Sequence, residues 1–242
     1  MILGDTRNSE IPLLTLMHTI FVREHNRIAG NLSGKGWSDE KTFQETRKIL
    51  TAMYQHIVFN EFLPAVLGFS WARSVGLISE PSGLINLYSS HIDGSTRNEF
   101  GASAFRMGHS LVGNLVGAAD SSFHEVINSD LKEEFFDTKT IRDVNDEFGV
   151  KRIGRWMSST YCQKMDRLFS NQLRNHLFEG DPGDALDLGA LNIQRGRDHG
   201  LPGYNKFREL CGLFPAAFFS NLQGGFVDHS SHNVAKLATL YK

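Results

Sequence analysis

The sequence has few cysteines and no long apolar run, and each shortage excludes a class of protein. Cys162 and Cys211 are the only two cysteines in 242 residues, too few for a disulfide framework and without a CxxC pair for metal. No segment reaches the roughly 18 apolar residues of a membrane span. The opening residues MILGDTRNSE lack the basic and apolar regions of a signal peptide, so none is expected in this chain.

The charge balance is also unremarkable, which excludes further classes. Lys and Arg number 25 and Asp and Glu number 27, so no basic excess points to nucleic acid. The motifs GxGxxG, GxxxxGK[ST], HExxH and GxSxG do not occur, so the familiar nucleotide, zinc-protease and serine-hydrolase signals are missing. Apolar residues make up 40% of the chain, and 18 residues are Phe, which fits a globular protein with a buried core.

Helical periodicity dominates, and the sequence predicts a mainly α fold. A first helix is expected over residues 10–32, with Pro12 in its first turn and its end near Gly30. A second helix is expected from the capping residue Ser38, with a kink at Pro64 and an end at Gly68. Its predicted buried side consists of Phe43, Ile49, Leu50, Met53, Tyr54, Ile57 and Val58.

The rest of the chain predicts shorter elements. Loops are expected over 69–98, a helix over 98–116, and one or two short helices within 121–147. Residues 150–180 predict a long helix broken near Ser158, 181–205 predict turns that become helical again at Pro202, and 232–242 predict a last helix. No boundary is evident, so residues 1–242 are expected to form a single domain. Because the first and last helices run up to the termini, we expect this domain to be incomplete at both ends.

The stretch FGASAFRMGHSLVG, residues 100–113, is rich in small residues around His109. Gly108 removes bulk beside the imidazole, and Arg106 lies one turn earlier on nearly the same face. A flat, anionic metal cofactor such as heme would use an imidazole, close backbone approach and a cation together. Tight helix–helix packing, with His109 as an ordinary core residue, explains the pattern equally well.

Two further polar stretches have both a structural and a functional interpretation. In GDTRNSEIP, Arg7 and Glu10 lie three residues apart, which suits a surface capping pair or a cation that stabilises negative charge on oxygen. In GALNIQRGRDHGLPGYN, Asn192 and Arg195 suit a salt-bridged loop or a segment that orients a ligand histidine.

Taken together, three blocks in this order resemble the animal-type heme peroxidases of the peroxidase–cyclooxygenase superfamily. The blocks are GDTRNSEIPLLTLMHTIFVREHNRIA, SAFRMGHSLV and LNIQRGRDHGLPGYN. The resemblance implies a helical peroxidase-like fold and a heme b cofactor. It also implies reduction of hydrogen peroxide with oxidation of a small organic or halide donor, in response to oxidative stress and outside the cell.

The resemblance implies a role for each candidate residue. His109 would be the proximal ligand of the heme iron and so the metal-binding residue, and Asn192 would accept its ring N–H. Arg7 would be the catalytic arginine that polarises peroxide, and Glu10 the residue that can be ester-linked to heme. Arg106 and Arg195 would pair with the heme propionates.

The resemblance also implies what this chain lacks. The family's distal histidine and calcium ligands belong to a block upstream of Arg7, and the partner of Cys211 is expected downstream of Lys242. Loss of a general base typically lowers a rate by about 10²–10⁴-fold. The alternative function is therefore a catalytically impaired heme-binding or adhesion-type remnant. No nucleic acid and no membrane span are expected.

Overall fold

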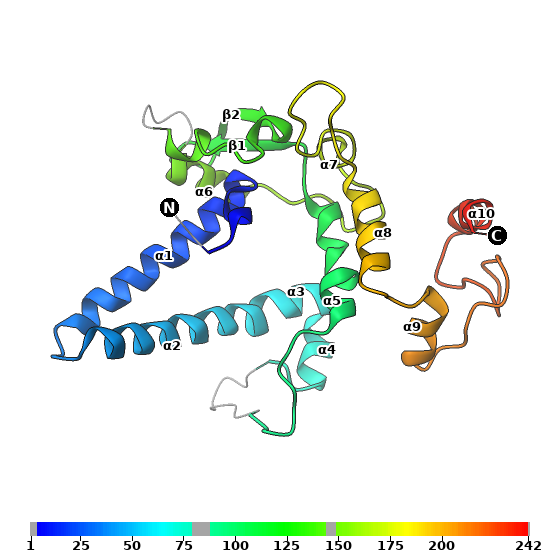
Figure 1. Cartoon of the computed structure of the whole chain (residues 1–242), viewed down its shortest axis with the longest axis horizontal. Coiled ribbons are helices and arrows are strands. Elements are labelled where there is room, and N and C mark those ends of the chain that lie inside the picture. Colours follow the sequence, from blue (N-terminus) through cyan, green and yellow to red (C-terminus); the bar gives the residue numbers. More distant parts are fainter. Residues whose placement is uncertain (1–3, 79–87, 144–148, 242) are drawn as a thin grey trace. The chain divides into compact units, whose positions relative to one another are not determined.

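The computed structural model describes residues 4–78, 88–143 and 149–241. These residues are mainly helical, which confirms the predicted fold class (Figure 1). Among them, no helix combines the length and the apolar character needed to cross a membrane. The α-helices are α1 (Pro12–Ser33), α2 (Asp39–Ile57), α3 (Leu63–Leu67), α4 (Phe69–Ser74), α5 (Asn98–Ala102), α6 (Gly149–Ser159), α7 (Asn171–Asn175), α8 (Leu188–Asp198), α9 (Tyr204–Leu210) and α10 (Ser231–Leu240).

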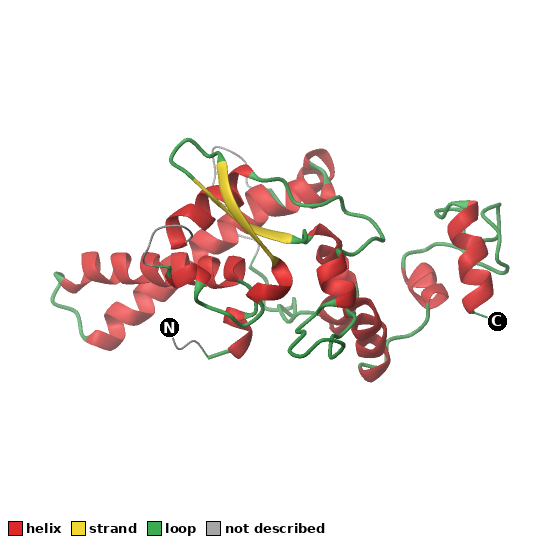
Figure 2. Ribbon diagram, turned by 90° about the horizontal axis from the view of Figure 1, so that it is seen from above, coloured by secondary structure: helices red, strands yellow, loops and turns green. Residues whose placement is uncertain are grey.

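The other regular elements are short. The two strands are β1 (Leu115–Ala119) and β2 (Glu125–Asp130), which pair antiparallel (Figure 2). The 3-10 helices are η1 (Thr6–Ser9), η3 (Ala104–Leu111), η4 (Leu131–Glu134) and η5 (Thr140–Arg142), and η2 (Val58–Phe62) is a π-helical turn.

The chain divides into two compact units. The first contains Met1–Ser95 and Met107–Leu188, and the second contains Thr96–Arg106 and Gly189–Lys242. The second unit therefore joins two segments that lie far apart in the sequence. That residues 1–242 form one partial domain stays a prediction.

The core of the first unit forms where α1, η5 and α6 meet. Pro12 occupies the first turn of α1, as predicted, since its missing N–H has no partner to lose there. One turn later Leu16 is buried against Ile141 of η5 and Ile153 of α6, with Leu13 packed beside them. The helical periodicity of this segment predicts an apolar stripe of Leu13, Leu16, Met17, Ile20 and Phe21. Leu16 is buried as this pattern predicts, whereas Met17 and Ile20 are 37% and 45% exposed.

The second helix forms as expected but does not bury its apolar side. Ser38 caps α2 by accepting a hydrogen bond from the Lys41 N–H, which confirms the predicted start. Phe43 and Tyr54 make ring contacts with α1, yet they remain 46% and 53% exposed. Only Thr46 of α2 is buried, so the predicted buried side is wrong. Helix α1 covers only one side of the apolar surface of α2. Among the described residues, no further element covers the rest of that surface.

The predicted kink and end of the second helix are confirmed. The helix widens into the π-turn η2 immediately before Pro64, whose ring removes a backbone donor. Gly68 then ends α3 with φ +87°, a conformation that costs little only for glycine. The next segment was predicted to be a loop, but residues 69–74 form α4; residues 79–87 lie outside the described residues.

Two of the other predicted helices are only partly confirmed, because each segment combines short helical elements with a strand. The helix predicted over 98–116 is instead α5, η3 and the start of β1, and residues within 121–147 form β2 and short 3-10 turns. The turn between the strands explains the difference. The Asp120 carboxylate accepts backbone hydrogen bonds from Ser122 and His124, and Phe123 has φ +64°. These contacts reverse the chain and let β1, which is buried from Val116 onward, pair with β2.

Strand β1 packs against α6 at a glycine. A Cβ atom at Gly117 would lie 2.6 Å from Cδ1 of Trp156, so only glycine admits the indole there. The Trp156 ring N–H in turn donates to the Glu125 carboxylate on β2. Helix α6 ends at Ser159, which confirms the break predicted near Ser158, but residues 161–170 are not helical and only α7 forms beyond them.

The second unit contains α8, which the sequence analysis predicted to be turns. Gly200 has φ +63°, and the Leu201 N–H donates to the Gly196 carbonyl at 3.0 Å. This bond and the Gly200 N–H bond to Arg197 end the helix as a Schellman motif. The glycines of this stretch thus terminate a helix instead of breaking it. Helices α9 and α10 confirm the predicted helical segments near the C-terminus.

A buried arginine organises the rest of the second unit. Arg208 of α9 is 8% exposed and donates to the Phe214 carbonyl, the Tyr204 hydroxyl and the Asp228 carboxylate. The Asp228 and Tyr204 partners raise the pKa of Arg208. These three bonds tie α9 to the loop that leads to α10.

Candidate functional site

The element at the centre of the candidate site is η3. It carries Arg106 and His109, which lie three residues apart, and residues i and i+3 of a 3-10 helix lie on the same side. His109 is half-buried, and its ring meets that of Phe169 edge to face at 6.0 Å. The segment that contains Phe169 runs along η3, because the Gln163 N–H donates to the Leu111 carbonyl at 2.9 Å.

Two glycines near His109 have open space beside them, whereas Ala102 and Ser110 of the same stretch are buried. A Cβ atom placed on Gly101 or Gly108 would meet no described atom within 4 Å. Tight helix–helix packing, one of the two interpretations of this stretch, is therefore not what these glycines provide. The space beside Gly108 is open to a flat group that approaches the backbone closely.

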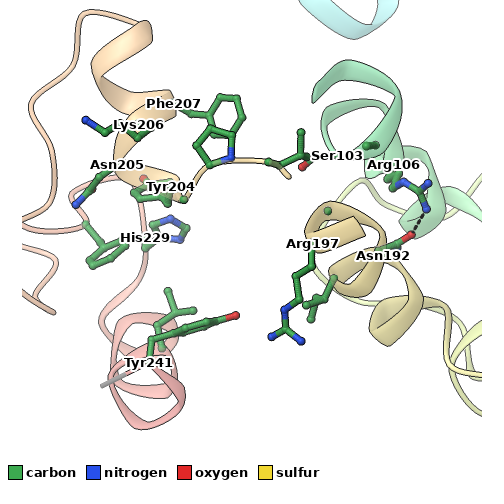
Figure 3. Close-up of a pocket in the computed structure, with 18 of the residues that line it drawn as sticks. Ser103, Arg106, Asn192, Arg197, Tyr204, Asn205, Lys206, Phe207, His229 and Tyr241 are labelled. Carbon is green, nitrogen blue, oxygen red and sulfur yellow. Dashed lines mark hydrogen bonds between the residues drawn. The ribbon is translucent and has the colours of Figure 1, made fainter. Parts of the chain in front are cut away.

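Arg106 makes the contact that joins two of the three sequence blocks. Its Nη1 donates to the Asn192 side-chain oxygen at 2.7 Å, across 86 positions of sequence and within the second unit (Figure 3). The Nε of Arg106 is buried and has no hydrogen-bond partner among the described residues. A buried donor without a partner is costly, so this position favours an anionic acceptor.

A second contact ties α8 to α5 in the same unit. His199 Nδ1 lies 2.6 Å from the Asn98 side-chain oxygen, and Asn98 Nδ2 donates to the His199 carbonyl at 3.1 Å. Because the Asn98 oxygen only accepts, Nδ1 is the protonated ring nitrogen. We call this reciprocal pair the Asn98–His199 clasp. The sequence analysis missed it; the available signal was the position of His199 inside the third block.

Arg7 lies in an exposed ion pair at the start of the chain. Its Nε and Nη2 bind the Asp5 carboxylate, with Nη2 at 2.6 Å, and its side chain is 77% exposed. This hydrogen bonding moves the pKa of Asp5 far below its usual range and raises that of Arg7. Asp5 also caps η1 through the Arg7 backbone N–H.

Glu10 is half-buried one turn after Arg7. Burial raises the pKa of its carboxyl, and the nearby Arg7 charge opposes that shift. Its backbone carbonyl accepts the Phe136 N–H at 3.1 Å, which fixes this turn against the segment after η4. The structure thus brings Glu10 and Arg7 together at the entrance to α1.

Arg195 lies in the last turn of α8 and is exposed. A cation there complements the negative end of the helix dipole. Of the six predicted site residues, Arg7, Glu10 and His109 belong to the first unit, and Arg106, Asn192 and Arg195 belong to the second. In the part of the chain that the structure describes, no group of three or more His, Cys, Asp or Glu could hold a metal ion.

The comparisons with known proteins agree with the three blocks. The family model described as "Animal haem peroxidase" matches residues 1–242. The chain belongs to this family. This peroxidase-family chain is 41% identical to eosinophil peroxidase of Mus musculus over 217 residues, which covers 87% of this chain and 29% of that protein. It is 36% identical to heme peroxidase 2 of Caenorhabditis elegans, with 98% and 33% covered.

A solved structure gives the same result for the fold. Peroxidase A from Dictyostelium discoideum superposes with a TM-score of 0.78 and 30% identity, over 98% of the peroxidase-family chain and 43% of that structure. The chain spans about a third or less of the curated relatives named above.

Proposed function

We propose that this chain carries the heme-binding part of a peroxidase that reduces hydrogen peroxide and oxidises an organic or halide donor. The observation that carries the proposal is the Arg106–Asn192 hydrogen bond, which joins two family blocks beside the histidine-bearing helix. Bound heme would supply the iron at which peroxide is reduced.

The residues present fit such a group. The open space beside Gly108 suits close approach of a porphyrin, and the unpartnered Arg106 Nε suits one of its carboxylates. In this proposal the Nε2 lone pair of His109 would hold the heme iron, and Asn192 would accept the N–H of the other ring nitrogen. The Asn192 oxygen has two lone pairs, so it can accept from Arg106 and from the imidazole together. Such a bond fixes the tautomer and makes the imidazole a stronger donor.

The proposal assigns to Arg7 the stabilisation of negative charge on the peroxide oxygens. Asp5 engages Nε and Nη2 of Arg7, which leaves Nη1 for a further acceptor. A fixed guanidinium aimed at developing charge lowers the barrier because it needs no reorganisation during the reaction. Asp5 therefore positions the cation that this role requires.

The remaining assignments concern how heme is held. Arg106 and Arg195 would bind the heme propionates, and Glu10 would be the position for an ester bond to the porphyrin. The raised pKa of Glu10, which reflects a partly dry environment, supports a location beside an apolar ring. Calcium is proposed for the whole protein, with ligands outside this chain, and so are secretion and a role in oxidative stress.

A heme reconstitution experiment tests the proposal. The 242-residue chain and its His109→Ala variant are titrated with hemin and followed by the Soret band, with the exposed His232→Ala as the matched control. We expect His109→Ala alone to lose the imidazole-type spectrum and added imidazole to restore it. Identical spectra for wild type and His109→Ala would refute the ligand assignment.

Activity of the same samples separates the two functions. Turnover of peroxide with a phenolic donor that is lost in Arg7→Ala supports a competent enzyme. A His109-dependent spectrum without turnover instead identifies the chain as the impaired heme-binding remnant.

A further inference from the structure

The second unit contains a cavity that borders the proposed heme site at Arg106 and Asn192 and extends beyond it. It has a volume of about 920 Å³ and lies among α8, α9 and α10 (Figure 3). This volume is in the range of small-molecule sites, which are commonly about 300–1,000 Å³. The cations Arg106, Arg197 and Lys206 line it, whereas no Asp or Glu is among the described residues of its wall. The charge of the wall therefore favours an anion.

Arg197 is the cation that remains available to a ligand. Arg106 binds Asn192 through Nη1 and its free Nε is assigned above to a heme carboxylate, while Lys206 is paired with Glu209 at 2.9 Å. No hydrogen bond or ion pair to a described residue engages the Arg197 guanidinium, which extends from α8 into the cavity (Figure 3). The hydroxyl end of Tyr241 points toward it from the opposite wall.

The wall opposite Arg197 is aromatic and already ordered. Tyr204 and Phe226 stack with ring centres 5.3 Å apart, and His229 meets both rings edge to face at 5.9 and 5.8 Å. The buried Arg208 holds the Tyr204 hydroxyl at 3.1 Å, so this wall is fixed before a ligand arrives. A preformed aromatic wall binds another ring at low entropic cost.

We propose that this cavity binds a small aromatic carboxylate, with its carboxylate on Arg197 and its ring against Tyr204 and Phe226. A guanidinium suits this role because its planar fork matches a carboxylate. The three residues that carry this proposal, Arg197, Tyr204 and Phe226, have no role in the proposed heme site, although the same wall contains Arg106 and Asn192.

The test uses 2-naphthoate, a fluorescent aromatic carboxylate, and its neutral amide 2-naphthamide. Binding to the heme-free 242-residue chain is measured by fluorescence anisotropy. We expect 2-naphthoate to bind at least tenfold more tightly than the amide, and Arg197→Gln to weaken 2-naphthoate by at least tenfold. Arg197→Lys should restore part of the affinity. Lys236→Gln is the matched control, because Lys236 is an exposed cation of α10 outside the cavity wall.

Three results would overturn the proposal. They are no binding of 2-naphthoate, equal binding of acid and amide, and equal binding by wild type and an Arg197→Gln variant with unchanged circular dichroism. A competition arm separates this site from the heme site. Hemin at one equivalent should leave 2-naphthoate bound, whereas stoichiometric displacement would show that the cavity belongs to the heme site.

Discussion

The Asn98–His199 clasp gives the sharpest prediction about how Asn192 is positioned, because it fixes the end of α8 on α5. Asn98→Ala removes both of its hydrogen bonds, at 2.6 and 3.1 Å. Both residues are exposed, so each bond contributes about 0.5 kcal/mol, the low end of the usual range. The variant should therefore lose about 1 kcal/mol, which corresponds to roughly fivefold more frequent opening of the α8 end.

Hydrogen exchange measured by mass spectrometry on peptides of α8 checks this magnitude. His199→Ala keeps its backbone carbonyl, so Asn98 can still donate to it and only one bond is lost. We expect about a twofold increase in exchange for His199→Ala, and no further increase when it is added to Asn98→Ala. The exposed His232→Ala is the control. Additive effects in the double variant, or unchanged exchange in Asn98→Ala, would refute the reasoning.

Two other perturbations test the first unit. Gly117→Ala should lower the free energy of unfolding by about 1–3 kcal/mol, because the new methyl group displaces the Trp156 indole. Urea unfolding followed by circular dichroism measures this loss. The loss should be smaller when Gly117→Ala is made in a Trp156→Leu variant. Glu10→Gln tests pH dependence: burial raises the folded-state pKa of this carboxyl, so its ionisation costs stability as pH rises through that pKa. The variant should therefore gain stability relative to wild type as pH rises above the ordinary glutamate pKa of about 4.3, and a difference that does not change with pH would contradict this.

The elements that the sequence predicted well depend on local signals. Ser38, Pro12 and Gly68 act within their own turn: one accepts a cap bond, one lacks a donor, and one adopts positive φ. Such effects depend on four or five consecutive residues. The sequence alone therefore predicted where the helices near these residues begin or end.

The elements that the sequence predicted badly depend on distant partners. Strand β1 exists because β2 pairs with it and Trp156 packs on Gly117, and neither contact can be read from the strand itself. The same holds for the candidate site. The six site residues followed from a family resemblance, while Asn98 and Arg197 became visible only when α5, α8 and α10 were placed in space.

The second unit is formed by two segments that lie far apart in the sequence, and this separation affects how the unit folds during translation. Asn98 leaves the ribosome 101 residues before its partner His199. At about 5–20 residues per second, α5 waits roughly 5–20 s before α8 exists to receive it. During that interval the Asn98 side chain lacks both of the hydrogen bonds that it makes with His199. A nascent chain stalled before Gly189 should therefore show faster hydrogen exchange in α5 than one released after Leu240.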